Sequence, residues 1–158
     1  MTQIPLFQPP SEWTPPETVP NLSEAKEIAV DLETYDPDIK TNGPGWAIDN
    51  GYIAGVAIAV EGWKGYFPIR HEGGGNFDEA ILKRQIQKVM DLPCDKIFHN
   101  AAYDVGWLRW WGVEVKGKII DTLIAAPLID ENRFRYSLNE LGKDYLKDTK
   151  SEALLYEA

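Results

Sequence analysis

The chain has 158 residues and a mass of 17.9 kDa, a size typical of one domain of about 100–150 residues. Its hydrophobic content of 44% and aromatic content of 11% favour a globular chain over a disordered one. The 25 acidic and 16 basic residues give a formal net charge of −9, which argues against tight binding of a phosphate backbone by this chain alone. A nucleic-acid substrate would need another domain to hold most of it, or metal ions to neutralise an acidic site.

Cysteine and hydropathy patterns indicate a cytoplasmic location. Cys94 is the one cysteine of the sequence, so no intrachain disulfide can form and a reducing compartment is expected. The segment Met1–Pro10 has neither the basic nor the apolar region of a signal peptide. The longest apolar run, Ile53–Val60, is too short to span a bilayer.

The first twenty residues hold six of the eleven prolines. Proline fixes φ and has no amide hydrogen, so residues 1–20 cannot form a helix or a central strand. We expect an extended arm over 1–20 that lies on a domain beginning at Asn21. A disordered leader is the alternative.

Hydrophobic periodicity and turn residues predict the elements of residues 21–158. Strands are expected over 28–34, 52–60, 65–69, 96–99 and 118–120, with a loop over 35–51. Helices are expected over 77–90, 101–111, 122–129 and from Ser137 to about Leu146, with a further helix beginning in Ser151–Ala158. Asn100 is expected to cap the second helix, and Ser137 with Glu140 forms a capping box for the fourth. This order predicts an α/β fold with a mixed sheet of three antiparallel strands followed by two parallel strands, flanked by helices.

Two carboxylates stand out on the first predicted strand. Asp31 and Glu33 are two residues apart, so both project from one face, while the residues between and before them face the core. Carboxylates on an otherwise apolar strand are costly to desolvate unless they are paired or bind a metal. Mg²⁺ and Mn²⁺ prefer such oxygen ligands. Two solvated carboxylates at a strand end are the alternative interpretation.

A second motif follows the fourth predicted strand. Asn100 and Asp104 are four residues apart at the start of a helix, so they lie on the same side of it. An acid in the first helical turn also has a simpler interpretation, since it complements the helix dipole.

Together the two motifs resemble the 3′–5′ exonuclease domain of family A DNA polymerases, which belongs to the DnaQ-like, DEDDy superfamily with a ribonuclease-H-like fold. Asp31 and Glu33 match the first motif of the family, and Asn100 and Asp104 match the second. The resemblance covers residues 28–146, and the Gly/Pro-rich loop over 42–51 is similar to phage polymerases in particular.

The third motif of that family, Tyr-x-x-x-Asp, is not found after the Ser137 helix. The resemblance therefore implies that residues 21–158 form an exonuclease domain that lacks its C-terminal helix, so that the fold is incomplete at its C-terminus. A shortened polymerase, or a partner that supplies the remainder, would account for this, and we expect such a shortened form to cleave poorly.

The resemblance implies two-metal phosphodiester hydrolysis with Mg²⁺ or Mn²⁺. Asp31 would bridge both ions, Glu33 would bind one and orient the water, and Asp104 would hold the second. The substrate would be a single-stranded DNA 3′ end, and the partner a polymerase domain in the same or another chain.

The resemblance also implies contacts to the terminal nucleotide from Thr34, Asn100 and the backbone of Leu32. Tyr103 and Trp107 are candidates for stacking on its base, with core packing as the alternative for both. A non-catalytic ribonuclease-H-like scaffold and a free-standing RNA exonuclease remain as alternative functions.

Overall fold

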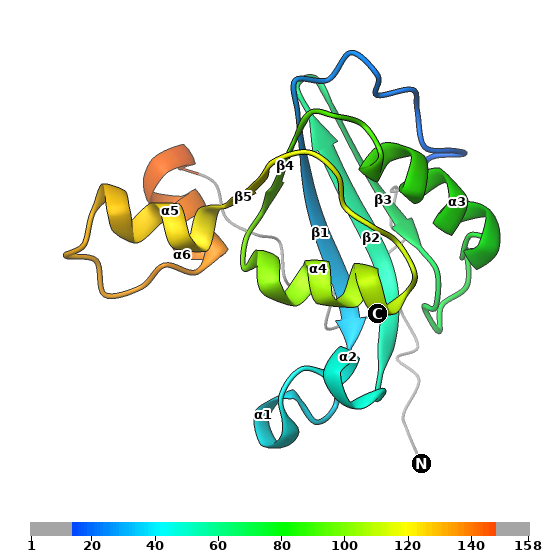
Figure 1. Ribbon diagram of the computed structural model, residues 1–158, viewed down its shortest axis with the longest axis horizontal. Helices are drawn as coiled ribbons and strands as arrows, with labels where there is room; N and C mark the ends of the chain where they lie inside the picture. Colours follow the sequence, from blue (N-terminus) through cyan, green and yellow to red (C-terminus); the bar gives the residue numbers. More distant parts are fainter. Residues whose placement is uncertain (1–13, 148–158) are drawn as a thin grey trace, which may run out of the picture.

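The computed structural model describes residues 14–147, which build one mixed five-stranded sheet in the order β3-β2-β1-β4-β5 (Figure 1). The strands are β1 (Glu27–Tyr35), β2 (Tyr52–Val60), β3 (Trp63–Pro68), β4 (Asp95–Phe98) and β5 (Ile119–Asp121). β1, β2 and β3 pair antiparallel, whereas β1 with β4 and β4 with β5 pair parallel. The predicted α/β fold and its mixed sheet are therefore confirmed.

The two faces of β1 differ as the alternating sequence predicts. Ile28, Val30 and Leu32 are buried, whereas Asp31 and Glu33 between them are only partly buried. The buried face joins residues of β2 and β3 in a continuous apolar core. Burial of this face stabilises the strand pairing and fixes its register, because a slip by one residue would move the carboxylates into the core.

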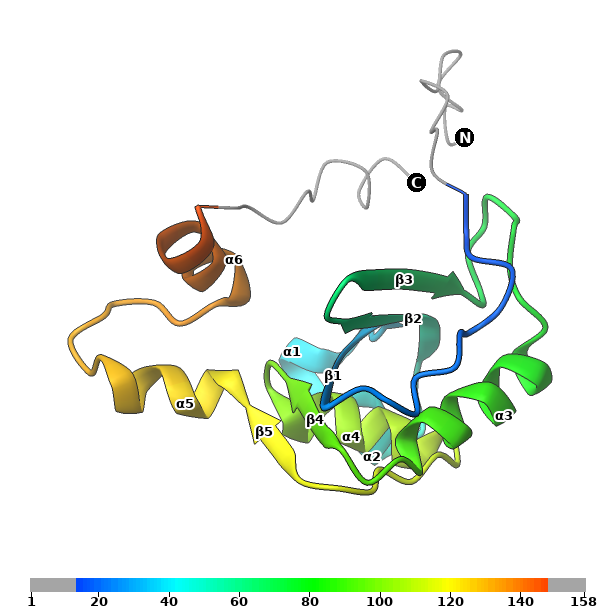
Figure 2. The ribbon, with the colours of Figure 1, turned by 90° about the horizontal axis from the view of Figure 1, so that it is seen from above.

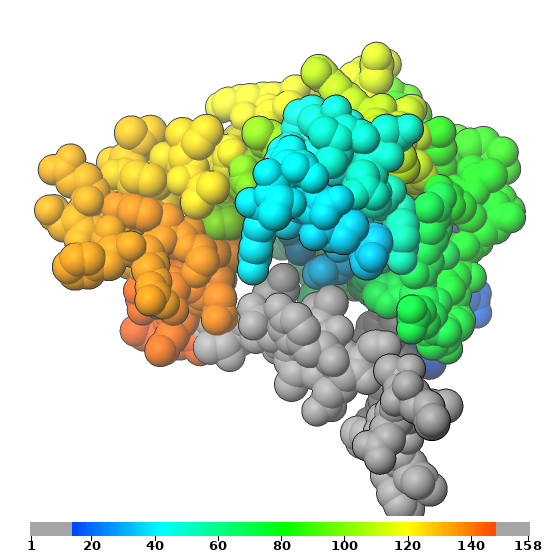
Figure 3. Space-filling model, turned by 90° about the horizontal axis from the view of Figure 1, so that it is seen from below, coloured from blue at the N-terminus to red at the C-terminus, as the bar shows by residue number. Residues whose placement is uncertain are grey.

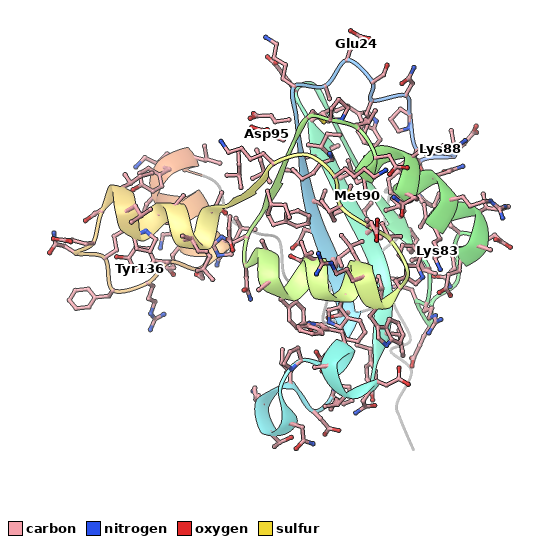
Figure 4. All side chains as sticks on the ribbon, viewed as in Figure 1. Glu24, Lys83, Lys88, Met90, Asp95 and Tyr136 are labelled. Atoms are coloured by element: carbon pink, nitrogen blue, oxygen red, sulfur yellow. The ribbon has the colours of Figure 1, made fainter. Side chains whose placement is uncertain are left out.

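Two helices cover the buried face of the sheet. α3 (Glu79–Met90) and α4 (Ala101–Trp110) lie on the same side of the sheet (Figure 2). Met90 of α3 lies between the helix and the sheet with no exposed surface, and Lys88 is exposed on the outer side of the helix (Figure 4). The Asp78 side chain accepts a hydrogen bond from the Ile81 amide, so α3 begins two residues later than the predicted helix over 77–90.

The remaining helices project beyond the β5 edge of the sheet (Figures 1 and 2). They are α5 (Thr122–Ile129), α6 (Leu138–Leu141) and η1 (Gly142–Leu146), a π-helical turn. The Ser137 side chain caps α6 by accepting the Glu140 amide at 3.3 Å, as the capping box predicts. The single α-helix expected from Ser137 to about Leu146 is wrong in its second half, because Gly142 lies where the helix widens.

The segment over 35–51 was expected to be a loop, but the structure shows otherwise. It holds two short helices, α1 (Ile39–Asn42) and α2 (Gly45–Ile48). Aspartate side chains close these turns: Asp36 accepts the Gly45 amide at 2.9 Å, and Asp38 accepts the Asn50 side-chain amide at 2.7 Å. Seen from below, this segment projects in cyan between the green α3 region and the yellow and orange α5–α6 region (Figure 3).

Part of the expected N-terminal arm is described, and residues 14–20 form neither helix nor strand. The Val19 amide donates to Gln85 of α3, so this part of the arm lies on the domain. Residues 1–13 and the helix predicted to begin in Ser151–Ala158 lie outside the described residues. Within residues 14–147, no helix is long and apolar enough to cross a membrane.

Candidate active site

The sheet presents Asp31 and Glu33 on the face away from α3 and α4. In the β1–β2 register Asp31 lies opposite Ala57, and Glu33 lies opposite Gly55. A register shift follows directly after Glu33, which is where a bulge redirects the strand. The β2 residues opposite both carboxylates are therefore small.

Asp104 lies in the first turn of α4 and is almost fully buried, with 3% of its surface exposed. Burial raises the pKa of Asp104 to about 7, and the negative charge of Asp31 is the next largest cause. Glu33 and Asp121 also raise it, whereas a hydrogen bond with the Leu32 backbone opposes the shift. The structure thus brings the three sequence-predicted carboxylates within electrostatic range of one another.

The carboxylate oxygens fit the chemistry of a hard divalent cation, although they do not surround one point. Among the described residues, no three His, Cys, Asp or Glu side chains form a single metal-ligand cluster. The negative charges of Asp31 and Glu33 both act on Asp104, which is nearly buried. A nearly buried Asp104 beside two further acids is the arrangement that a bound cation relieves.

The start of α4 is held by a residue that the sequence analysis did not single out for this role. Asn100 adopts a left-handed conformation with φ 72°, and its side chain makes no capping hydrogen bond, so the predicted Asn100 cap is wrong. The Asp121 carboxylate accepts instead from the amides of Asn100 at 2.9 Å and Ala101 at 2.8 Å. Asp121 also accepts the Leu123 amide at 2.9 Å and thereby caps α5. An acid between a predicted strand and a predicted helix was the available signal.

The proposed nucleotide contacts fall at the end of β1 and on α4. The Tyr103 hydroxyl donates to Asp36 at 2.8 Å and lies 2.8 Å from the Thr34 hydroxyl. Burial is the main cause that raises the pKa of Tyr103. The Leu32 side chain belongs to the core, and its backbone forms a hydrogen bond with Asp104.

Trp107, the other stacking candidate, has no exposed surface and packs edge-on against Tyr103. The core interpretation therefore holds for Trp107. Of the two stacking candidates, Tyr103 is the one that is only half-buried. This leaves Tyr103 and Thr34 as partly accessible groups, with Asn100 exposed next to them along the chain.

Comparison with known proteins identifies the family. Residues 12–155 match the 3′–5′ exonuclease family of A-type DNA polymerases. A DNA-directed DNA polymerase of Pseudomonas phage M6 is 38% identical over 161 residues, which cover 97% of this chain and 24% of that protein. DNA polymerase DpoZ of Salmonella phage PMBT28 is 31% identical over 140 residues, 87% of this chain and 20% of that protein. The chain thus spans about a quarter or less of the length of these relatives.

The fold agrees with the same assignment. NrnC of Brucella melitensis, solved with bound Mg²⁺, superposes with a TM-score of 0.62 at 20% identity, over 84% of this chain and 60% of that one. The chain belongs to the 3′–5′ exonuclease family, and its sheet has the ribonuclease-H-like arrangement of such nucleases. It is the exonuclease domain type found in phage DNA polymerases, and enzymes of this family generally depend on divalent metal ions.

Proposed function

We propose that this chain removes nucleotides one at a time from the 3′ end of single-stranded DNA, as the proofreading part of a phage DNA polymerase. The observation that carries the proposal is the nearly buried Asp104 carboxylate, whose pKa is raised first by burial and then by the charges of Asp31, Asp121 and Glu33. The family and the phage polymerase relatives support DNA as the substrate, a polymerase domain as the partner, and action inside the bacterial or phage-infected host cell.

The three carboxylates would hold two Mg²⁺ or Mn²⁺ ions, with two carboxylates for each ion. Asp31 would contribute to both sites, Glu33 to one and Asp104 to the other, so no single point needs three of these side chains. Such ions, when bound, activate the attacking water and stabilise the leaving 3′ oxygen. A cation also offsets the net charge of −9 where the DNA phosphate approaches.

The neighbouring residues would orient the terminal nucleotide. Tyr103 is fixed by its hydroxyl contacts with Asp36 and Thr34, so its ring offers a preorganised surface for a base. Thr34, Asn100 and the Leu32 backbone line the same end of β1 and the start of α4. A terminal nucleotide held there lies beside Asp31 and Glu33, where the bond to be cleaved must be.

The test uses single-stranded DNA labelled at its 5′ end, with Mg²⁺ or Mn²⁺ and the chain as it stands. Wild type is expected to give a ladder of 3′-shortened products that a chelator abolishes. Asp31→Asn is expected to lower the rate by about 10²-fold or more, because it removes a positioned catalytic group. Calorimetric titration with Mn²⁺ should show weaker binding by the same variant.

The matched controls make the same type of substitution, acid to amide, at positions away from the site. Asp95→Asn at the start of β4 and Glu24→Gln before β1 alter acids at the opposite end of the sheet (Figure 4). Both should leave cleavage and Mn²⁺ binding unchanged. Equal Mn²⁺ affinity in wild type and Asp31→Asn would refute the proposed metal site. DNA binding without any shortening would favour the non-catalytic scaffold, and faster shortening of RNA would correct the substrate.

A further inference from the structure

Tyr66 of β3 lies on the carboxylate-bearing face of the sheet. In the antiparallel registers Asp31 is opposite Ala57, and Ala57 is opposite Tyr66, so the three side chains form a row across β1, β2 and β3. Directly opposed residues in a sheet point to the same face. Tyr66 therefore projects on the side of Asp31 and Glu33, away from the core.

The tyrosine hydroxyl lies over Gly55, the β2 residue opposite Glu33. A Cβ atom at position 55 would lie 2.0 Å from the Tyr66 hydroxyl oxygen, a distance that no side chain tolerates. Gly55 has an ordinary negative-φ strand conformation, because it is not among the positive-φ glycines. Its lack of a side chain thus serves the close approach of Tyr66 and not a turn. The hydroxyl is thereby brought across β2 toward Glu33.

His71 holds the hydroxyl from the other side. The Tyr66 hydroxyl and His71 Nε2 are 2.6 Å apart, and the two rings meet edge-on with centroids 5.7 Å apart. His71 is itself fixed by Asn76, which accepts the His71 amide and donates to the His71 carbonyl, each at 2.8 Å. The loop after β3 is thus closed around a histidine that points back at the sheet.

Proton counting decides what this pair can do. A phenol is protonated at neutral pH and has one proton to donate. If His71 carries its proton on Nε2, the histidine donates to the tyrosine oxygen, and the tyrosine proton remains for a carboxylate. In the opposite tautomer Nε2 is an acceptor, and the tyrosine proton is directed to His71.

We propose that His71 and Tyr66 form a positioning pair for Glu33, in which His71 donates from Nε2 to the Tyr66 hydroxyl and the tyrosine proton is directed to the Glu33 carboxylate. This inference rests on the proposed role of Glu33 in holding a cation and orienting the water. A second hydrogen-bonding partner fixes which carboxylate oxygen faces the cation, and removal of such partners typically costs about 10–100-fold in metal affinity or activity.

The test compares Tyr66→Phe, His71→Gln and His71→Phe in Mn²⁺ calorimetry and in steady-state cleavage of 5′-labelled single-stranded DNA. Tyr66→Phe keeps the ring and should lower Mn²⁺ affinity and kcat by about 10–100-fold, with KM for DNA unchanged. His71→Gln offers an amide donor and should retain most of the activity, whereas His71→Phe should resemble Tyr66→Phe. Tyr52→Phe, the same change on β2, is the matched control.

A double variant separates positioning from a structural role. Glu33→Gln with Tyr66→Phe should be no slower than Glu33→Gln alone, because the tyrosine acts through Glu33. Gly55→Ala should displace the hydroxyl and reproduce Tyr66→Phe, while Gly73→Ala, where a Cβ meets nothing, should not. Independent, multiplying losses in the double variant, or wild-type Mn²⁺ affinity and kcat in Tyr66→Phe, would overturn this inference alone. A wild-type chain that neither binds Mn²⁺ nor shortens DNA would overturn the proposed function, and this inference with it.

Discussion

Replacement of Asp104 by Asn should change how stability depends on pH in metal-free protein. The pKa of Asp104 is raised from 3.8 to about 7 by burial and by the neighbouring acids. Between these values the folded chain holds a proton that the unfolded chain has released, so the free energy of unfolding falls as pH rises. The stability lost by ionising buried Asp104 is absent well below pH 4 and reaches its full value above pH 7. Asn resembles the protonated acid and cannot ionise, so this pH dependence should vanish in the variant.

The magnitude follows from the shift itself. A raised pKa of about 3 units corresponds to about 4 kcal/mol of lost stability at pH 8, because each unit is worth 1.36 kcal/mol. At pH 5 the same group costs about 2 kcal/mol, since only part of the window has been crossed. The stability of Asp104→Asn relative to wild type should therefore improve by about 2 kcal/mol between pH 5 and pH 8. Asp104 is nearly fully buried, so solvent screening weakens this value little.

Urea denaturation at pH 5, 6, 7 and 8 in the presence of a chelator measures this difference. Asp91→Asn is a control that should show no pH dependence over this range, because a hydrogen bond from Lys116 lowers the pKa of the exposed Asp91 carboxyl, so that this group is ionised in both states above pH 5. Saturating Mn²⁺ should flatten the wild-type slope, since a cation favours the ionised form of Asp104. A stability difference between Asp104→Asn and wild type that stays constant from pH 5 to pH 8 would refute the raised pKa of Asp104, and with it the burial of this carboxylate beside the other acids.

Two further substitutions test the groups that hold the site in place. Asp121→Ala leaves the amides of Asn100, Ala101 and Leu123 without their acceptor. It should therefore destabilise the chain by about 2–3 kcal/mol and speed amide exchange at the start of α4. Asp130→Ala, after α5, is the control and should not change amide exchange there. An unchanged exchange rate at Ala101 would contradict this capping role. Asp36→Ala removes the acceptor of the Tyr103 hydroxyl. It should raise KM for single-stranded DNA several-fold and leave Mn²⁺ affinity unchanged. An unchanged KM would argue against Tyr103 as a nucleotide contact.

The sheet and its two covering helices could be predicted because their residues follow simple periods. Alternation on β1 placed Ile28, Val30 and Leu32 inside, and the structure buries all three. The short helices α1 and α2 could not be predicted, since each has only four residues. Their segment also depends on contacts such as the Asp36 side chain accepting the Gly45 amide nine residues later. The π-helical turn after Leu141 likewise has no periodic signal in five residues.

The carboxylates could be predicted because each lies at a fixed place relative to its own element. The placement of Asp104 beside Asp31 and Glu33, by contrast, depends on how α4 packs against the end of β1. Tyr66 and His71 gave no signal, because their importance depends on the register of β3 with β2 and on the absence of a side chain at Gly55. Pairwise register between strands is long-range information that local patterns do not carry.

Asp104 and Asp121 show why proximity alone does not define a metal-binding acid. Both are aspartates close enough for the charge of one to raise the pKa of the other. Asp121 uses both carboxylate oxygens to accept three backbone amides, so its charge is already stabilised by the ends of two helices. Asp104 has the Leu32 backbone as its stabilising hydrogen bond, and its pKa stays high, so its ionised form still needs a positive partner. The acid whose hydrogen bonds do not offset its burial is the one that gains from a cation, and that distinction assigns Asp121 to the scaffold and Asp104 to the proposed metal site.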